Sequence, residues 1–68
     1  MSYSIEELRI LKARVLECNP NDLVYYDYNN YGKRGVVVYW NCINPNHRKY
    51  QSTVAVRILT NGVIELGS

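Results

Sequence analysis

No stretch of this 68-residue sequence approaches the ~20 consecutive apolar residues of a membrane-spanning helix, so we expect no membrane protein. The first residues, 1–7, contain two acids and no basic stretch, which argues against a secretory signal peptide. The expected location is therefore cytoplasmic. The length suits one domain and is too short for two, so residues 1–68 are expected to form a single domain.

Residues that catalyse reactions or bind metals are scarce. The cysteines are Cys18 and Cys42, and the one histidine is His47. Structural zinc needs four ligands, usually in closely spaced pairs, and no such pair is present. Nucleophilic catalysis needs a base and an orienting group beside the nucleophile, whereas His47 is expected in a solvated turn. We therefore expect no enzyme activity, no cofactor and no metal. Both cysteines are expected as free buried thiols, with a disulfide between them as the alternative.

Neither sign of charge dominates the chain. Eight Lys and Arg residues against six Asp and Glu residues give a net charge of +2, too small to indicate nucleic acid binding by itself. Phenylalanine is absent, whereas tyrosine occurs seven times and asparagine is frequent. Tyrosine favours strands and wet interfaces, and asparagine favours turns. The composition thus predicts a β-rich protein with many turns.

The clearest local signal is the start of a helix. Ser4 and Glu7 have the spacing of a capping box, in which each side chain bonds the backbone N–H of the other. Asn19 is expected to take the left-handed position after the helix, which should end near Cys18 before Pro20. The apolar positions that follow a helical period are Ile5, Leu8, Leu11, Val15, Leu16 and Cys18.

Two residues depart from this helical pattern. Lys12 lies within the apolar stripe, where its stem could pack while the ammonium group stays in water. Ile10 lies on the opposite side of the helix, as a stray exposed residue or as a contact for a partner. The sequence favours the first interpretation of Ile10 without excluding the second.

Four strands are predicted after the helix, at residues 23–28, 36–43, 51–59 and 63–66. Asn-Gly at 61–62 is a strong hairpin signal, and residues 29–35 and 44–49 are expected to form the other two turns. No connection is long enough for a parallel crossover, so the sheet should be antiparallel. The predicted fold class is α+β, with an N-terminal amphipathic helix packed on one face of a three- to four-stranded antiparallel β-meander.

Alternation along the strands predicts two different faces. The inner face, packed on the helix, should hold Val36, Val38, Trp40, Cys42, Val54, Val56, Ile58, Ile64 and Leu66. The outer face should hold Val37, Tyr39, Asn41 and Ile43, with Gln51, Thr53, Ala55, Arg57 and Leu59. One helix covers only one face, and an apolar exposed face usually marks a contact surface.

The first functional hypothesis is a small non-enzymatic protein-binding module that modulates or inhibits a larger partner. Its contact residues would lie on the outer face and the first hairpin: Tyr39, Val37, Asn41, Arg57, Tyr26 and Tyr31. A second copy of the chain is the simplest partner. The short length and the Tyr and Asn bias are typical of accessory proteins of phages and mobile elements.

The alternative hypothesis is a single-stranded nucleic-acid-binding protein with a Tyr/Arg sheet face. Bases would stack on the sheet, and basic side chains would contact phosphates; the candidates are Tyr39, Lys33, Arg34, Arg48, Lys49 and Arg57. A meander, however, places the basic residues of the first loop and of the second loop at opposite ends of the sheet. This separation weakens the hypothesis.

Overall fold

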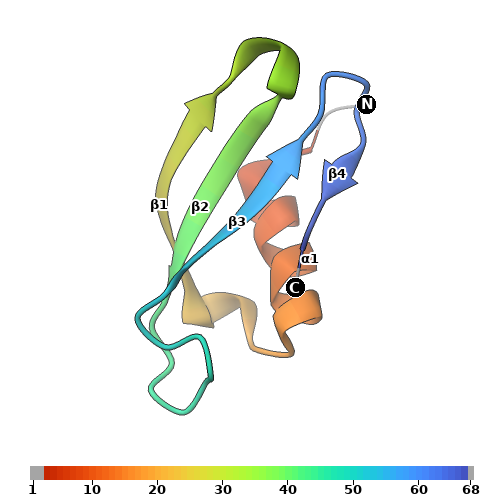
Figure 1. The fold of residues 1–68 in the computed structure, drawn as a ribbon. Coiled ribbons are helices and arrows are strands. Elements are labelled where there is room, and N and C mark those ends of the chain that lie inside the picture. The colour runs from red at the N-terminus through yellow and green to blue at the C-terminus, as the bar shows by residue number, and fades with distance from the viewer. Residues whose placement is uncertain (1–2, 68) are drawn as a thin grey trace.

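The computed structural model describes residues 3–67. The chain folds into a capped helix followed by a β-meander. The helix α1 spans Ile5–Leu16, and the strands are β1 (Leu23–Asn30), β2 (Val36–Cys42), β3 (Thr53–Ile58) and β4 (Ile64–Glu65). The strands form one antiparallel sheet in the order β1-β2-β3-β4, and α1 lies against one side of it (Figure 1). The predicted α+β class and strand order are confirmed. Within the described residues, no helix has the length and apolar character needed to span a bilayer.

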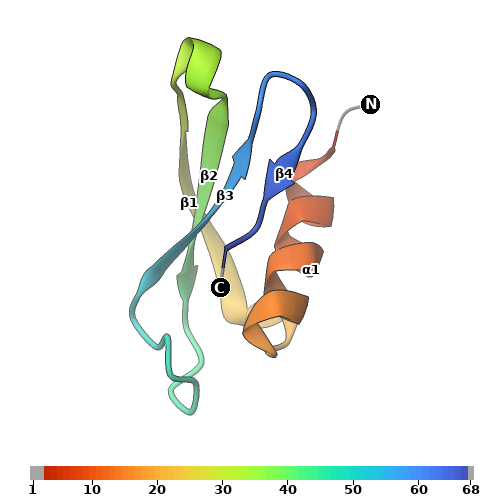
Figure 2. The ribbon, with the colours of Figure 1, turned by 45° about the vertical axis from the view of Figure 1, so that its right-hand side comes forward.

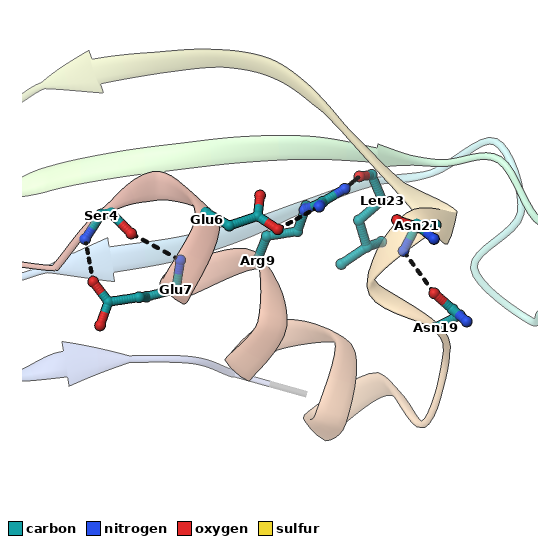
Figure 3. A network of polar contacts seen from close by, with 7 residues as sticks. All are labelled: Ser4, Glu6, Glu7, Arg9, Asn19, Asn21 and Leu23. Carbon is teal, nitrogen blue, oxygen red and sulfur yellow. Dashed lines mark hydrogen bonds and ion pairs between the residues drawn. The ribbon is translucent and has the colours of Figure 1, made fainter.

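The start of α1 is the capping box predicted from the sequence. The Ser4 hydroxyl accepts the Glu7 N–H over 3.1 Å, and the Glu7 carboxylate accepts the Ser4 N–H over 3.0 Å (Figure 3). These two bonds satisfy backbone donors that have no partner inside the helix. The Ser4 backbone N–H, and after it the Ser4 hydroxyl, also lowers the pKa of the Glu7 carboxyl group, because hydrogen bonds to the carboxylate stabilise its charged form.

We expect Ser4→Ala to lower the free energy of unfolding by about 0.5–2 kcal/mol. The substitution removes the acceptor for the Glu7 N–H and leaves the core untouched. Urea denaturation followed by circular dichroism measures the change. Ser52→Ala, a substitution outside the helix, is the matched control, and equal midpoints for Ser4→Ala and the unmodified chain would remove the capping argument.

The end of α1 differs from the prediction. The helix stops at Leu16, and Glu17 rather than Asn19 takes the left-handed conformation, with φ 59°. The reason is local, because the Cys18 N–H donates to the Ala13 carbonyl over 3.0 Å and closes the last turn early. Asn19 instead caps a short 3₁₀ turn, Pro20–Asp22, through its side-chain oxygen and the Asn21 N–H (Figure 3).

The bounds of the strands also differ from the prediction. β1 continues to Asn30, because Asn29 and Asn30 pair with Val37 and Val36 instead of forming a loop. β2 ends at Cys42 rather than at residue 43, and β3 begins at Thr53, since residues 43–52 form a longer connection that includes Gln51 with φ 66°. β4 is reduced to Ile64–Glu65.

The core lies between α1 and the predicted inner face of the sheet. The buried cluster contains Leu8, Ala13, Leu16, Leu23, Val38, Trp40, Cys42, Val54 and Val56, with Val36, Ile58, Ile64 and Leu66 packed against it. This confirms the predicted inner face. The helix contribution differs, because Ala13 is buried while Leu11 and Val15 are only half-buried and Ile5 is 45% exposed. Figure 2 shows α1 beside β4, with the upper part of β1 away from the helix.

Lys12 is buried instead of extending into water. Its side chain is 3% exposed, and its ammonium group donates to the Leu66 carbonyl, which ties the C-terminal segment to α1. Loss of hydration lowers the pKa of Lys12 from its ordinary value of 10.5, and the charge of Lys49 adds to this effect. The buried charge therefore costs stability wherever it is retained in the folded chain.

This cost predicts a dependence of stability on pH. Between the lowered pKa of folded Lys12 and its unfolded value of 10.5, the unfolded chain binds the extra proton, so raising the pH favours folding. Lys12→Met should lack this rise, because it has no proton to release. Urea unfolding of both chains from about pH 8 to about pH 10.5 should show this difference in the pH dependence of stability. Both chains contain the same tyrosines, so the effect of tyrosine titration cancels in the comparison. Parallel curves of unfolding free energy against pH for the unmodified chain and Lys12→Met would contradict this prediction.

Candidate functional site

The exposed apolar and aromatic side chains concentrate on the first hairpin. Within residues 3–67, five of the ten large exposed hydrophobic residues lie between positions 24 and 31: Val24, Tyr25, Tyr26, Tyr28 and Tyr31. Along β1 only Leu23 is buried. We call Tyr25, Tyr26 and Tyr28 the tyrosine edge, because β1 is an edge strand that pairs only with β2.

A β-bulge arranges the tyrosine edge. The register shifts between Tyr25 and Asp27, so Tyr25 lies opposite Trp40 and Tyr28 lies opposite Val38. Both partners are inner-face residues, and Tyr25 and Tyr28 therefore share the inner side despite their spacing of three. They remain exposed because α1 reaches only the start of β1, and the rest of the strand runs away from the helix (Figure 2). The sequence places both residues in the first hairpin, but the predicted contact set did not include them and simple alternation puts them on opposite faces, since nothing in the sequence signals the bulge.

The backbone of the β1 edge is protected against pairing with another strand. The Arg9 guanidinium donates to the Leu23 carbonyl over 3.3 Å (Figure 3), and the Asp27 carboxylate accepts the Tyr28 N–H over 2.8 Å. Side-chain charges and a bulge are the usual ways in which proteins block an edge strand. These contacts disfavour extension of the sheet at Leu23 and Tyr28.

A network of polar contacts covers part of the outer face. The hydroxyl groups of Tyr31 and Tyr39 lie 3.2 Å apart, and the Asn29 amide donates to the Tyr31 hydroxyl over 3.3 Å. The hydrogen bond to Tyr31 raises the pKa of Tyr39. The guanidinium of Arg57 lies 5.8 Å from the centre of the Tyr31 ring, close enough for a cation–π contact.

Arg57 is held in place from two further directions. It donates to the Arg34 carbonyl over 3.0 Å, and its Nε lies 3.6 Å from a Glu65 carboxylate oxygen. The ion pair is partly exposed, so it orients the guanidinium more than it stabilises the fold. Tyr31, Tyr39 and Arg57 therefore form one outer-face cluster from the hairpin loop, β2 and β3.

The structure brings together some of the predicted contact residues and separates others. Val37 was expected to be exposed, but it is 5% exposed beside its register partners Asn29 and Arg57. The expectation was wrong, and we attribute the burial of Val37 to Tyr31 of the loop that precedes β2, whose hydroxyl lies 3.2 Å from that of Tyr39 on the same face. Asn41 accepts a hydrogen bond from the Thr53 hydroxyl over 2.9 Å, farther along β2. Tyr26, 62% exposed, lies apart at the bulge.

The basic residues of the nucleic-acid hypothesis are spread over the molecule. Lys33 and Arg34 lie in the first hairpin loop, whereas Arg48 and Lys49 lie in the connection between β2 and β3 at the opposite end (Figure 1). This confirms the predicted separation. Of the predicted cations, the guanidinium of Arg57 is the one in contact with the tyrosines of the outer face.

His47 has a structural setting that the sequence did not reveal. Its Nδ1 accepts the Lys49 N–H over 3.0 Å, so its Nε2 donates to the Leu16 carbonyl over 2.8 Å. The half-buried ring thus joins the long connection to the end of α1 and is not a solvated turn residue. Both nitrogens are occupied by backbone groups.

The two cysteines are free thiols. Burial raises the pKa of Cys18, and nearby Asp22 adds to the effect, so the reactive thiolate is disfavoured. Within residues 3–67, no three side chains of His, Cys, Asp or Glu are grouped closely enough to hold a metal ion.

Fold and surface together define a small α+β domain with an exposed, tyrosine-bearing hairpin. No family model matches the chain, and searches of curated proteins and of solved structures find no similar protein.

Proposed function

We propose that the chain is a non-enzymatic protein-binding module that modulates or inhibits a larger partner, in the manner of small phage or mobile-element accessory proteins. The single observation that carries the proposal is the run of exposed residues along β1, where Leu23 alone is buried. The contact surface consists of the tyrosine edge with Tyr31 and Tyr39 beside it.

The chemistry of this surface suits a protein partner. Tyrosine offers a large apolar ring and a polar end, and it loses little conformational entropy because it has two side-chain torsions. Asp27 is the one charged residue in β1, and its carboxylate is engaged with the Tyr28 N–H. Interface cores are similarly enriched in tyrosine and depleted of charge.

The test compares variants in a pull-down from the cells that make this protein. Tyr26→Ser with Tyr28→Ser removes two rings without touching the core, since both are exposed. Tyr50→Ser removes an exposed tyrosine outside the hairpin and serves as the matched control. We expect the hairpin variant to lose a protein that the control retains. Identical bound proteins for all three chains would contradict the proposal.

Single-stranded nucleic acid is the second candidate, supported by the Arg57 guanidinium beside Tyr31. Stacking on tyrosines and contact with phosphates would give an affinity that falls steeply with salt. Fluorescence anisotropy with a labelled single-stranded oligonucleotide at several salt concentrations measures this. Binding that is lost in Arg57→Gln and weakens with salt would favour the nucleic-acid candidate over a protein partner.

A further inference from the structure

A second surface lies on the side of α1 that faces away from the sheet. A shallow groove there is lined by Tyr3, Glu7, Ile10, Leu11 and Arg14. At 100° per residue Glu7, Ile10 and Arg14 lie opposite the buried positions Leu8, Lys12 and Leu16, Leu11 lies at the border between the two sides, and Tyr3 precedes the helix. Within the helix the spacing 7, 10, 14 alternates three and four residues, as in a helix–helix seam.

The charges along this groove complement those of a second copy of the groove that runs in the opposite direction. Glu7 lies one turn before the apolar pair Ile10 and Leu11, and Arg14 lies one turn after it. When two copies of α1 pack antiparallel about a two-fold axis between positions 10 and 11, Glu7 lies level with the partner subunit's Arg14. The symmetry repeats the ion pair at the other end, and Ile10 of each copy meets Ile10 of the partner subunit at the axis.

The side chains are available for this arrangement. One oxygen of the Glu7 carboxylate bonds the Ser4 N–H, and the structure gives its second oxygen no partner within residues 3–67. Among these residues Arg14 is in neither of the two ion pairs, Arg9–Glu6 and Arg57–Glu65. Ile10 and Leu11 are half-buried at the groove and thus have area left to bury.

We propose that α1 is a self-association surface and that its occupant is α1 of a second copy of this chain, packed antiparallel. The surface is separate from the tyrosine hairpin, which stays free, so the dimer presents two hairpins to its partners. A helix of three turns buries less than the roughly 800 Å² per subunit of a standard interface, so the dimer is weak. Two linked hairpins gain avidity when a partner offers two sites.

The experiment is sedimentation of the full chain over a range of concentrations, with charge exchange at the two positions. Arg14→Glu places Glu7 opposite a glutamate, and Glu7→Arg places Arg14 opposite an arginine. Each variant alone should associate about tenfold more weakly or worse, because like charges then face each other. An equal mixture of the two variants should associate again, since every facing pair is then opposite in charge.

The controls separate this packing from other effects of charge. Lys33→Glu makes the same change in net charge as Arg14→Glu, but it lies in the hairpin loop and should leave association intact. Glu7→Arg loses half of the capping box, so circular dichroism is used to check that this variant is folded. If Glu7→Arg is unfolded, the double variant Glu7→Gln with Arg14→Gln replaces the charge exchange and should associate more weakly than the unmodified chain. A chain that is monomeric at all concentrations up to about 1 mM would overturn the proposal, because that corresponds to binding weaker than about 4 kcal/mol. Association unaffected by Arg14→Glu, or a mixture that stays monomeric, would overturn it as well.

Discussion

Trp40→Ala is expected to lower the free energy of unfolding by roughly 3–5 kcal/mol, which a domain of this size hardly survives. Trp40 is 0% exposed and is the largest fully buried side chain. Trp40 belongs to β2, where its register partners are Tyr25 of β1 and Val54 of β3. Removal of the ring leaves a cavity where the sheet meets the buried cluster.

Trp40→Phe is the matched control for this substitution. Within the described residues the indole N–H of Trp40 has no hydrogen-bond partner, so phenylalanine keeps most of the packing and removes an unsatisfied donor. We expect it to cost much less than alanine in urea denaturation. Fluorescence of the single tryptophan should be shifted to short wavelength and poorly quenched by acrylamide. A solvent-like spectrum would mean that the helix covers the other face.

Gly35→Ala is the second large effect, with an expected loss of at least about 3 kcal/mol from backbone strain and overlap together. Gly35 has φ 88°, and a Cβ at this position would lie 2.1 Å from the Ile58 carbonyl oxygen. That oxygen belongs to the backbone of β3, so it cannot move aside without disturbing the sheet. The first hairpin and β3 approach closely here because glycine has no side chain.

Gly62→Ala separates the two causes of this effect. Gly62 also has φ 88°, but a Cβ there meets nothing within 4 Å. It should therefore show the conformational strain alone, at about 1 kcal/mol or slightly more. Equal losses of stability for the two variants in urea denaturation would show that the approach to Ile58 is looser than the structure has it.

The features that could be predicted from the sequence are those fixed by neighbouring residues. The capping box of Ser4 and Glu7 depends on a spacing of three, and the inner face of β2 and β3 depends on alternation. Both are local rules, and both hold. The hairpin signal at Asn61 and Gly62 likewise places the turn before β4.

The features that could not be predicted depend on contacts between distant residues. Lys12 can be buried because the Leu66 carbonyl, 54 positions away, accepts a hydrogen bond from its ammonium group. His47 is held by the Leu16 carbonyl at the end of α1, and Val37 is buried on the face where Tyr31 of the preceding hairpin loop reaches Tyr39. The tyrosine edge depends on one extra residue in β1, and a single shift of register exchanges the faces of a strand.

Site-specific photocross-linking tests most directly whether the tyrosine edge contacts a protein. A photoreactive phenylalanine analogue replaces Tyr26 in the full chain, and the same analogue at Tyr50 is the control, since both positions are exposed. After irradiation in the cells that make this protein, we expect a discrete cross-linked protein from position 26, which mass spectrometry identifies. We expect none of that cross-linked species from position 50. No protein cross-link from position 26, or the same products from both positions, would contradict this expectation.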